Sequence, residues 1–224
     1  MYWKKGGIPV KKNNYSLMLS EGVVNAIDAE AARLGTNRSA LINRILAEYV
    51  SYVTPEMRIR QILCSVRETL DGAFRRDGEG ENILCMTTAL SYRYNPTVRY
   101  ALELYRSGES LGEIRVSMRT KNPLLLEIFA DFCAHFAAVE KRYMGKGEYG
   151  FGEGRFIRVL RLRKNDGIAD MMTLEELGGY VAHYISMLDR ALKLYCRYAA
   201  DIAEALSVLD GVYRKYLSEA TVLL

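Results

Sequence analysis

The chain has 224 residues, 50% of them hydrophobic and 26% charged, and a formal net charge of +4. This composition is ordinary for a soluble globular protein of one or two domains and supplies ample material for a hydrophobic core. No apolar run is long enough to span a bilayer, and residues 1–7 lack the apolar core of a secretory signal, so we expect no membrane partner. The cysteines show no paired spacing, which indicates reduced thiols in a cytoplasmic protein; they are Cys64, Cys85, Cys133 and Cys196.

Positive charge is concentrated near the N-terminus. Residues 1–53 hold seven Lys or Arg against four acidic residues, whereas residues 54–224 hold 24 against 23. Four of the seven lie in residues 1–13, an arm that also contains Gly6, Gly7 and Pro9. The asymmetry fits a basic nucleic-acid-binding head on a nearly neutral body. The arm of residues 1–13 is then either solvated or in contact with phosphates.

Residues 14–53 read as one short strand followed by two short helices. Along residues 14–19, apolar residues alternate with Asn14, Ser16 and Met18, which is the period-two pattern of a half-buried strand. A strand of this length and two helices of about four turns bury too little surface to be stable alone. Antiparallel pairing of two copies would cover both the strand edge and the apolar helix faces.

Residues with capping preferences delimit the two helices. Ser20 is expected to cap the first helix with its hydroxyl, and Gly35 follows its expected end. Asn37 is expected to cap the second helix, which Thr54-Pro55 then stops. With these features, the segment resembles the ribbon-helix-helix superfamily of DNA-binding dimers, the Arc, MetJ and CopG type. The resemblance rests on the strand-Ser-Glu join, on the pattern L-G-x-N-R-S-x-L-I and on the register of apolar positions.

The resemblance implies a two-stranded ribbon that enters the major groove of double-stranded DNA. The residues that would read base edges are Asn14, Ser16 and Met18. The residues that would contact phosphates are Asn37, Arg38 and Ser39 at the second helix N-terminus, joined by Lys11 and Lys12 of the arm. Met18 departs from the short polar or basic residue more common at its position, which leaves the base preference open. A ribbon-helix-helix fold used only for pairing is the alternative.

Beyond residue 53 the pattern predicts a mixture of helices and strands. A third helix is expected over residues 56–74, and the polar, Gly-containing residues 75–81 indicate a linker. The elements expected after it are a strand over 87–94, a strand pair over 98–104 and 114–118, a helix over 123–143 and a strand over 156–163. The Gly-rich residues 145–154 follow a helix and precede a strand, the reverse of a phosphate-binding loop, and favour a flexible connection.

Two patterns in the second half of the chain, one of arginines and one of apolar residues, each allow more than one interpretation. The arginines of the last strand belong either to a solvated strand or to a second anion-binding surface; they are Arg155, Arg158, Arg161 and Arg163. From Leu174 to Tyr216, apolar residues recur at three-four spacing over six heptads. This stripe predicts long helices that close the C-terminal core, and it is long enough to extend the subunit contact and make a tetramer.

The sequence offers little support for catalysis. His135 and His183 lie in strongly apolar helical segments, where a core histidine with a satisfied hydrogen bond is the expected role. Cys133 and His135 are about 200° apart around a helix and do not face one metal ion. The His and Cys ligands of the nickel-sensing domain that some ribbon-helix-helix regulators carry are not present. We therefore expect no enzyme, no metal site and no cofactor.

The expected fold class is mainly α with a smaller β part. It comprises a ribbon-helix-helix head with its arm over residues 1–53, a connecting helix and linker over 54–80, and an α+β region over 81–224 closed by long C-terminal helices. The expected function is sequence-specific DNA binding by a homodimer, most simply as a transcriptional repressor. The alternatives are an accessory protein of plasmid maintenance or conjugative transfer and an antitoxin-like interaction module, although the C-terminal region is more core-like than a disordered toxin-wrapping tail.

Overall fold

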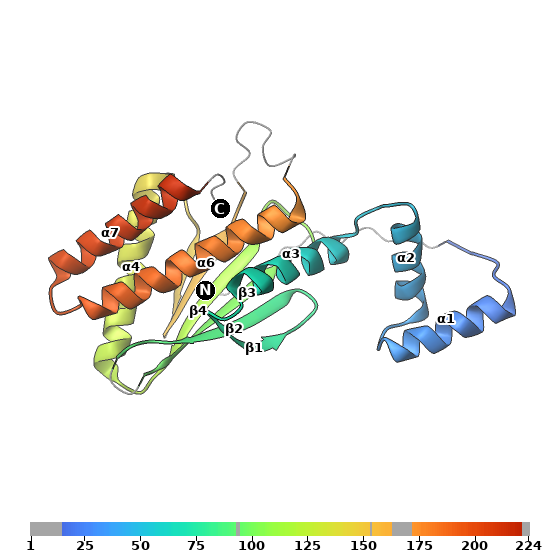
Figure 1. The fold of residues 1–224 in the computed structure, drawn as a ribbon, viewed down its shortest axis with the longest axis horizontal. Coiled ribbons are helices and arrows are strands. Elements are labelled where there is room, and N and C mark those ends of the chain that lie inside the picture. Colours follow the sequence, from blue (N-terminus) through green and yellow to red (C-terminus); the bar gives the residue numbers. More distant parts are fainter. Residues whose placement is uncertain (1–14, 93–94, 153, 163–171, 221–224) are drawn as a thin grey trace.

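A computed structural model of the protein describes residues 15–92, 95–152, 154–162 and 172–220. Its helices are α1 (Glu21–Arg33), α2 (Arg38–Tyr49), α3 (Pro55–Leu70), α4 (Pro123–Met144), α6 (Leu174–Arg197) and α7 (Ile202–Glu219). Its strands are β1 (Arg75–Glu79), β2 (Ile83–Ala89), β3 (Thr97–Leu104), β4 (Gly112–Arg119), β5 (Tyr149–Gly152) and β6 (Arg155–Leu160). Figure 1 shows α1 and α2 projecting away from a body that contains all the other elements.

The body is built on one antiparallel sheet with the strand order β1-β2-β3-β4-β6-β5. Side chains that lie opposite each other on neighbouring strands share a face, so the strand register defines the two faces of the sheet. One face is buried under helices, as the row Met86, Tyr100, Val116 and Phe156 illustrates. The next row along the strands, Thr87, Arg99, Ser117 and Arg155, therefore lies on the opposite face. The side chains of this second row are half-buried or exposed, and we call their face the open face.

The hydrophobic core fills the space between the sheet and helices α3, α4, α6 and α7. Helices α3 and α6 cross in front of the sheet in Figure 1, and α7 packs against α6. The ring of Phe136 on α4 meets the ring of Phe156 on β6 edge-on at 6.0 Å between centroids. None of the described helices is long and apolar enough to cross a membrane.

The expected fold class is wrong in two respects. First, the sheet is the centre of the body and not a minor part, because residues 75–79 and 149–152 form its edge strands β1 and β5 in place of the expected linker and flexible connection. Second, the chain does not begin with a ribbon-helix-helix head: residues 15–20 form no strand, and the first described element is helix α1. A strand needs a neighbour for its backbone N–H and C=O groups, and the described chain gives residues 15–19 none.

Several single elements are confirmed with small shifts of their ends. The third helix, the strand pair around the turn at 107–110, the apolar helix from Pro123 and the last strand are all present as α3, β3, β4, α4 and β6. The strand expected over 87–94 is only partly right, because β2 runs from Ile83 to Ala89 and residues 90–92 form no strand. The C-terminal stripe is divided between two helices, because Asp201 caps α7 after a break at residues 198–201.

The apolar stripe of residues 174–216 packs into the core of its own chain. Its members Val181, Leu188 and Tyr195 on α6, and Leu209 and Tyr213 on α7, are buried in the common core. The apolar surface that suggested a tetramer is therefore already covered within the chain and does not support a tetramer.

A close approach of α3 and α6 requires glycine at position 178. A Cβ atom on Gly178 would lie 2.5 Å from Cβ of Ser65 and 2.9 Å from the backbone oxygen of Ile62, whereas one on Gly179 would meet nothing within 4 Å. We expect Gly178→Ala to lower the free energy of unfolding by about 1–3 kcal/mol, because the helices must separate. Gly179→Ala is the matched control and should be neutral or stabilising, since alanine favours a helix. Urea unfolding of the two variants checks this, and equal effects would contradict it.

Candidate nucleic-acid interface

The first two helices and the residues that flank them form a small unit with few buried residues. We call this unit, residues 15–53, the head. Gly35 adopts a positive φ of 62° just after α1, where a residue without Cβ avoids strain, and the chain turns there into α2. Asn37 caps α2 as expected, its side-chain oxygen accepting a hydrogen bond from the backbone N–H of Ala40 at 2.9 Å. Ser20 stands at the N-cap of α1 but makes no side-chain capping bond. Within α1 and α2, only Ala31, Leu41 and Ala47 are buried.

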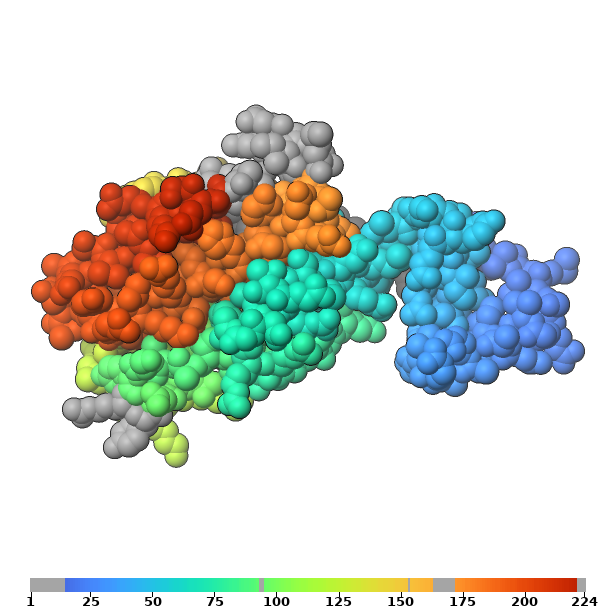
Figure 2. Space-filling model, viewed as in Figure 1, coloured from blue at the N-terminus to red at the C-terminus, as the bar shows by residue number. Residues whose placement is uncertain are grey.

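The head carries most of the exposed apolar surface of the described chain. Twelve of the fifteen large hydrophobic residues that are exposed lie between residues 15 and 53, and the other three lie on the body. The twelve are Tyr15, Leu17, Met18, Leu19, Val23, Leu34, Ile45, Leu46, Tyr49, Val50, Tyr52 and Val53. Exposed apolar side chains gathered in one short stretch of chain make this region a candidate interaction site. Figures 1 and 2 show α1 and α2 beside the body. Each of the twelve side chains is at least 39% exposed, so the rest of the chain leaves them largely uncovered.

The segment of residues 15–20 forms no helix or strand and is exposed along its whole length. Two of the three residues expected to read DNA bases, Ser16 and Met18, are among its exposed side chains. The third, Asn14, lies outside the described residues. Tyr15 and Leu17, on the alternate positions, are exposed as well, so neither side of the segment is packed against the protein.

The residues expected to contact phosphates have different surroundings. Asn37, Arg38 and Ser39 are all exposed at the N-terminus of α2. Arg38, however, points its guanidinium at Asp28 of α1, and its Nε donates to the carboxylate at 2.6 Å. This hydrogen bond holds the pKa of Asp28 below its usual value. Lys11 and Lys12 lie outside the described residues.

Each arginine of the head has an acidic partner in the structure. Besides the Arg38–Asp28 pair, Arg33 pairs with Glu30 and Arg44 with Glu48. The excess positive charge of residues 1–53 therefore comes from the four lysines of the arm. Phosphate binding by the head would depend on those lysines and on the free N–H groups at the start of α2.

The structure reveals a buried polar cluster that was not expected. The Glu140 carboxylate accepts hydrogen bonds from Arg158 Nε at 2.9 Å, from Tyr149 at 2.6 Å, from Tyr184 at 2.9 Å and from Tyr213 at 3.3 Å. Burial, together with this carboxylate, raises the pKa of Tyr184 well above its usual value. The signals were present in the sequence: Glu140 is an acid in an apolar helix, and Arg158 is inward-facing between Phe156 and Leu160. The cluster fills the core beneath the sheet, so we interpret it as structural.

A second buried carboxylate and the two histidines also have partners. Asp189 accepts hydrogen bonds from Thr88 at 2.8 Å, Tyr100 at 3.1 Å and Lys193 at 2.6 Å. Nδ1 of His135 lies 2.7 Å from the Tyr195 hydroxyl oxygen. No group of three His, Cys, Asp or Glu that could hold a metal ion occurs among the described residues.

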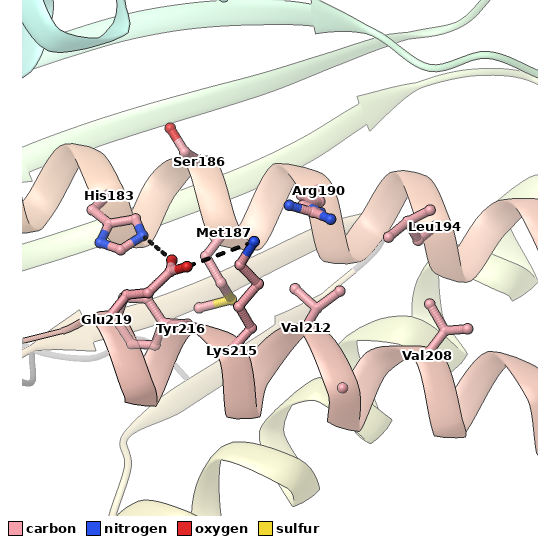
Figure 3. Close-up of a pocket in the computed structure, with 11 residues that line it drawn as sticks. His183, Ser186, Met187, Arg190, Leu194, Val208, Val212, Lys215, Tyr216 and Glu219 are labelled. Atoms are coloured by element: carbon pink, nitrogen blue, oxygen red, sulfur yellow. Dashed lines mark ion pairs between the residues drawn. The ribbon is translucent and has the colours of Figure 1, made fainter.

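A shallow groove of about 380 Å³ runs between α6 and α7. Figure 3 shows Glu219 between His183 and Lys215, with Nε2 of His183 at 3.7 Å and Nζ of Lys215 at 3.6 Å from its carboxylate oxygens. Met187 and Val212 form part of its apolar lining. With its charges largely paired, the groove does not indicate a particular ligand.

Comparison with protein-family models, with curated proteins and with solved structures gave no match. The candidate interface therefore stands on the residues of this chain: an exposed segment without helix or strand, a capped helix N-terminus and many exposed apolar side chains, all within residues 15–53.

Proposed function

We propose that the protein is a sequence-specific DNA-binding protein that acts as a homodimer, most simply as a transcriptional repressor. The observation that carries the proposal is the apolar surface of the head, which the body leaves uncovered. A second copy is the occupant that would cover all of it by symmetry, since each copy brings the same surface. The resemblance of residues 14–53 to DNA-binding dimers supports the same reading.

In the proposed complex, the extended segments of two copies pair with each other and enter the major groove. Pairing would satisfy the backbone groups of residues 15–19, which make no hydrogen bond in the described chain. It would bury Tyr15, Leu17 and Leu19 against the helices and leave Asn14, Ser16 and Met18 towards the bases. The start of α2 and the arm lysines would hold phosphates on either side.

Selection of bound duplexes from a random pool tests the proposal. We expect the full chain to enrich a short site with twofold symmetry, since a symmetric dimer reads two equal half-sites. Replacing Asn14, Ser16 and Met18 together with alanine should remove the preference for that site, because each good base contact supplies about 1–3 kcal/mol of discrimination.

The matched control replaces three exposed polar residues away from the segment, Asn25, Gln61 and Ser207, with alanine. This variant should select the same site with the same affinity. Failure of the parent chain to enrich any sequence would refute the proposal. Equal selection by the parent and by the segment variant would show that another surface reads the bases.

A further inference from the structure

The open face of the sheet carries a regular row of basic and hydroxyl side chains. The row crosses five strands and consists of Arg75, Thr87, Arg99, Ser117 and Arg155, each directly opposite the next in the strand register. All five therefore lie on the same face. Arg119 belongs to the neighbouring row, opposite Thr97, and extends the basic region along β4.

Three of the four arginines of this region are available for a ligand. Arg75, Arg119 and Arg155 are exposed, and none of them makes an ion pair within the part of the chain that the structure describes. Arg99 pairs with Asp77 at 2.5 Å. The other end of the same face differs, because there Arg115 pairs with both Glu103 and Glu113. The open face thus has one basic end and one neutralised end.

The side chains of the row are of the kinds that bind phosphates. Neighbouring strands are about 4.8 Å apart, so arginines on every second strand start about 10 Å apart, with Thr87 and Ser117 on the strands between them. The Thr87 hydroxyl donates to the backbone oxygen of Arg75 at 3.4 Å, which leaves Ser117 as the hydroxyl donor of the row. Guanidinium groups bind phosphate with two parallel N–H bonds, and hydroxyls contribute further donors. The open-face rows that pass through Thr97, Arg99 and Ala101 of β3 hold no aromatic residue among the described positions. Single-stranded nucleic acid is normally held by stacking of its bases on aromatic rings. Because these rows offer no such rings, the phosphate backbone of a duplex is the favoured ligand.

We propose that the basic end of the open face, defined by Arg75, Arg99, Arg119 and Arg155, is a second contact surface for the phosphate backbone of duplex DNA. This inference rests on the proposed function, because duplex DNA is the ligand of both surfaces. The head would read sequence, whereas the open face would add affinity that is independent of sequence and sensitive to salt.

This surface differs from the one that the arginine pattern of the last strand suggested. Of those arginines, Arg158 lies on the helix-covered face with Glu140, and Arg161 pairs with Glu148 at 2.7 Å. Arg163 lies outside the described residues. Arg155 faces the open side, where the strand register joins it to arginines from β1, β3 and β4.

The test compares two triple variants of the full chain with equal loss of charge. One variant replaces Arg75, Arg119 and Arg155 with glutamine. The control replaces Arg60, Arg190 and Arg197, which are exposed on α3 and α6 and likewise lack an ion pair in the described chain. Affinity for the selected duplex and for a duplex of unrelated sequence is measured over a series of NaCl concentrations. We expect the open-face variant to bind both duplexes at least about tenfold more weakly and to lose up to about three units of log–log salt slope, while the control keeps the parent slope.

A lysine version of the open-face variant keeps the charge and should retain the parent slope. Equal slopes for the open-face variant, the control and the parent would overturn the inference and leave the proposed function intact. Loss of binding only to single-stranded DNA or to anionic lipid vesicles would also overturn it. If the parent bound duplex DNA without sequence preference, and the open-face variant still lost its slope, the inference would stand while the proposed reading by the head would fail. Absence of any duplex binding would refute both.

Discussion

Replacement of Glu140 with alanine is expected to lower the free energy of unfolding by about 3–5 kcal/mol, enough to remove much of the stability of a typical domain. Glu140 and Arg158 are 0% and 3% exposed, and the carboxylate also accepts hydrogen bonds from three tyrosine hydroxyls. The substitution leaves the Arg158 guanidinium buried without its counter-charge and leaves those hydroxyls without an acceptor. A buried unpaired charge costs more than the loss of the attraction itself.

Two further variants separate this explanation from a general effect of mutating α4. Glu127 lies on the same helix but is exposed, so Glu127→Ala should change stability by less than about 0.5 kcal/mol. Glu140→Leu combined with Arg158→Met removes both charges, and it should be less unstable than the sum of the two single changes. Chemical unfolding of all the variants measures these differences. Strict additivity in the double variant would show that the two side chains do not stabilise each other.

The same pair illustrates which parts of this fold a sequence can predict. The sequence interpretation left Arg158 with the other arginines of its strand, on a solvated or anion-binding surface, whereas the structure buries it between Phe156 and Leu160. Glu140 lies eighteen residues earlier on a helix, and only the packing of α4 onto the sheet brings the two together. The local pattern therefore predicted α3, β3, β4 and α4. It could not predict which side chains meet in the core, or that Arg158 is buried there, because both depend on how the elements pack.

The edge strands show a second limit. Residues 75–79 are polar with one glycine, and residues 149–152 include two glycines, so neither shows the alternation of a half-buried strand. Edge strands lack a neighbour on one side and tolerate charge and glycine, which makes their sequences resemble loops. For residues 15–20 the opposite holds. The alternation is clear, but a strand exists only where a partner pairs with it, and the described single chain offers none.

Conversion of three apolar residues of α2 and its C-cap to glutamine is expected to abolish the proposed homodimer without affecting the stability of the body. Ile45, Leu46 and Val50 are 45%, 50% and 66% exposed in the single chain, so they contribute little to its core. In a symmetric dimer each position is buried twice, and burial of such a side chain contributes about 1.5–3 kcal/mol. Loss of all three should therefore weaken dimerisation by at least about 5 kcal/mol, more than a thousandfold in Kd.

The control for this experiment uses the three exposed large hydrophobic residues of the body, Leu124, Phe151 and Ile202, which also become glutamine. Sedimentation equilibrium should show the parent and the control as dimers and the α2 variant as a monomer. Thermal unfolding should be the same for the body of the parent and of the α2 variant, because the body's core does not include the altered residues. Since the proposed DNA reading needs two copies of residues 14–18, the α2 variant should also lose selection of the symmetric site. A dimer that survives in the α2 variant but dissociates in the control would place the subunit contact on the body and leave the apolar surface of the head for a different partner.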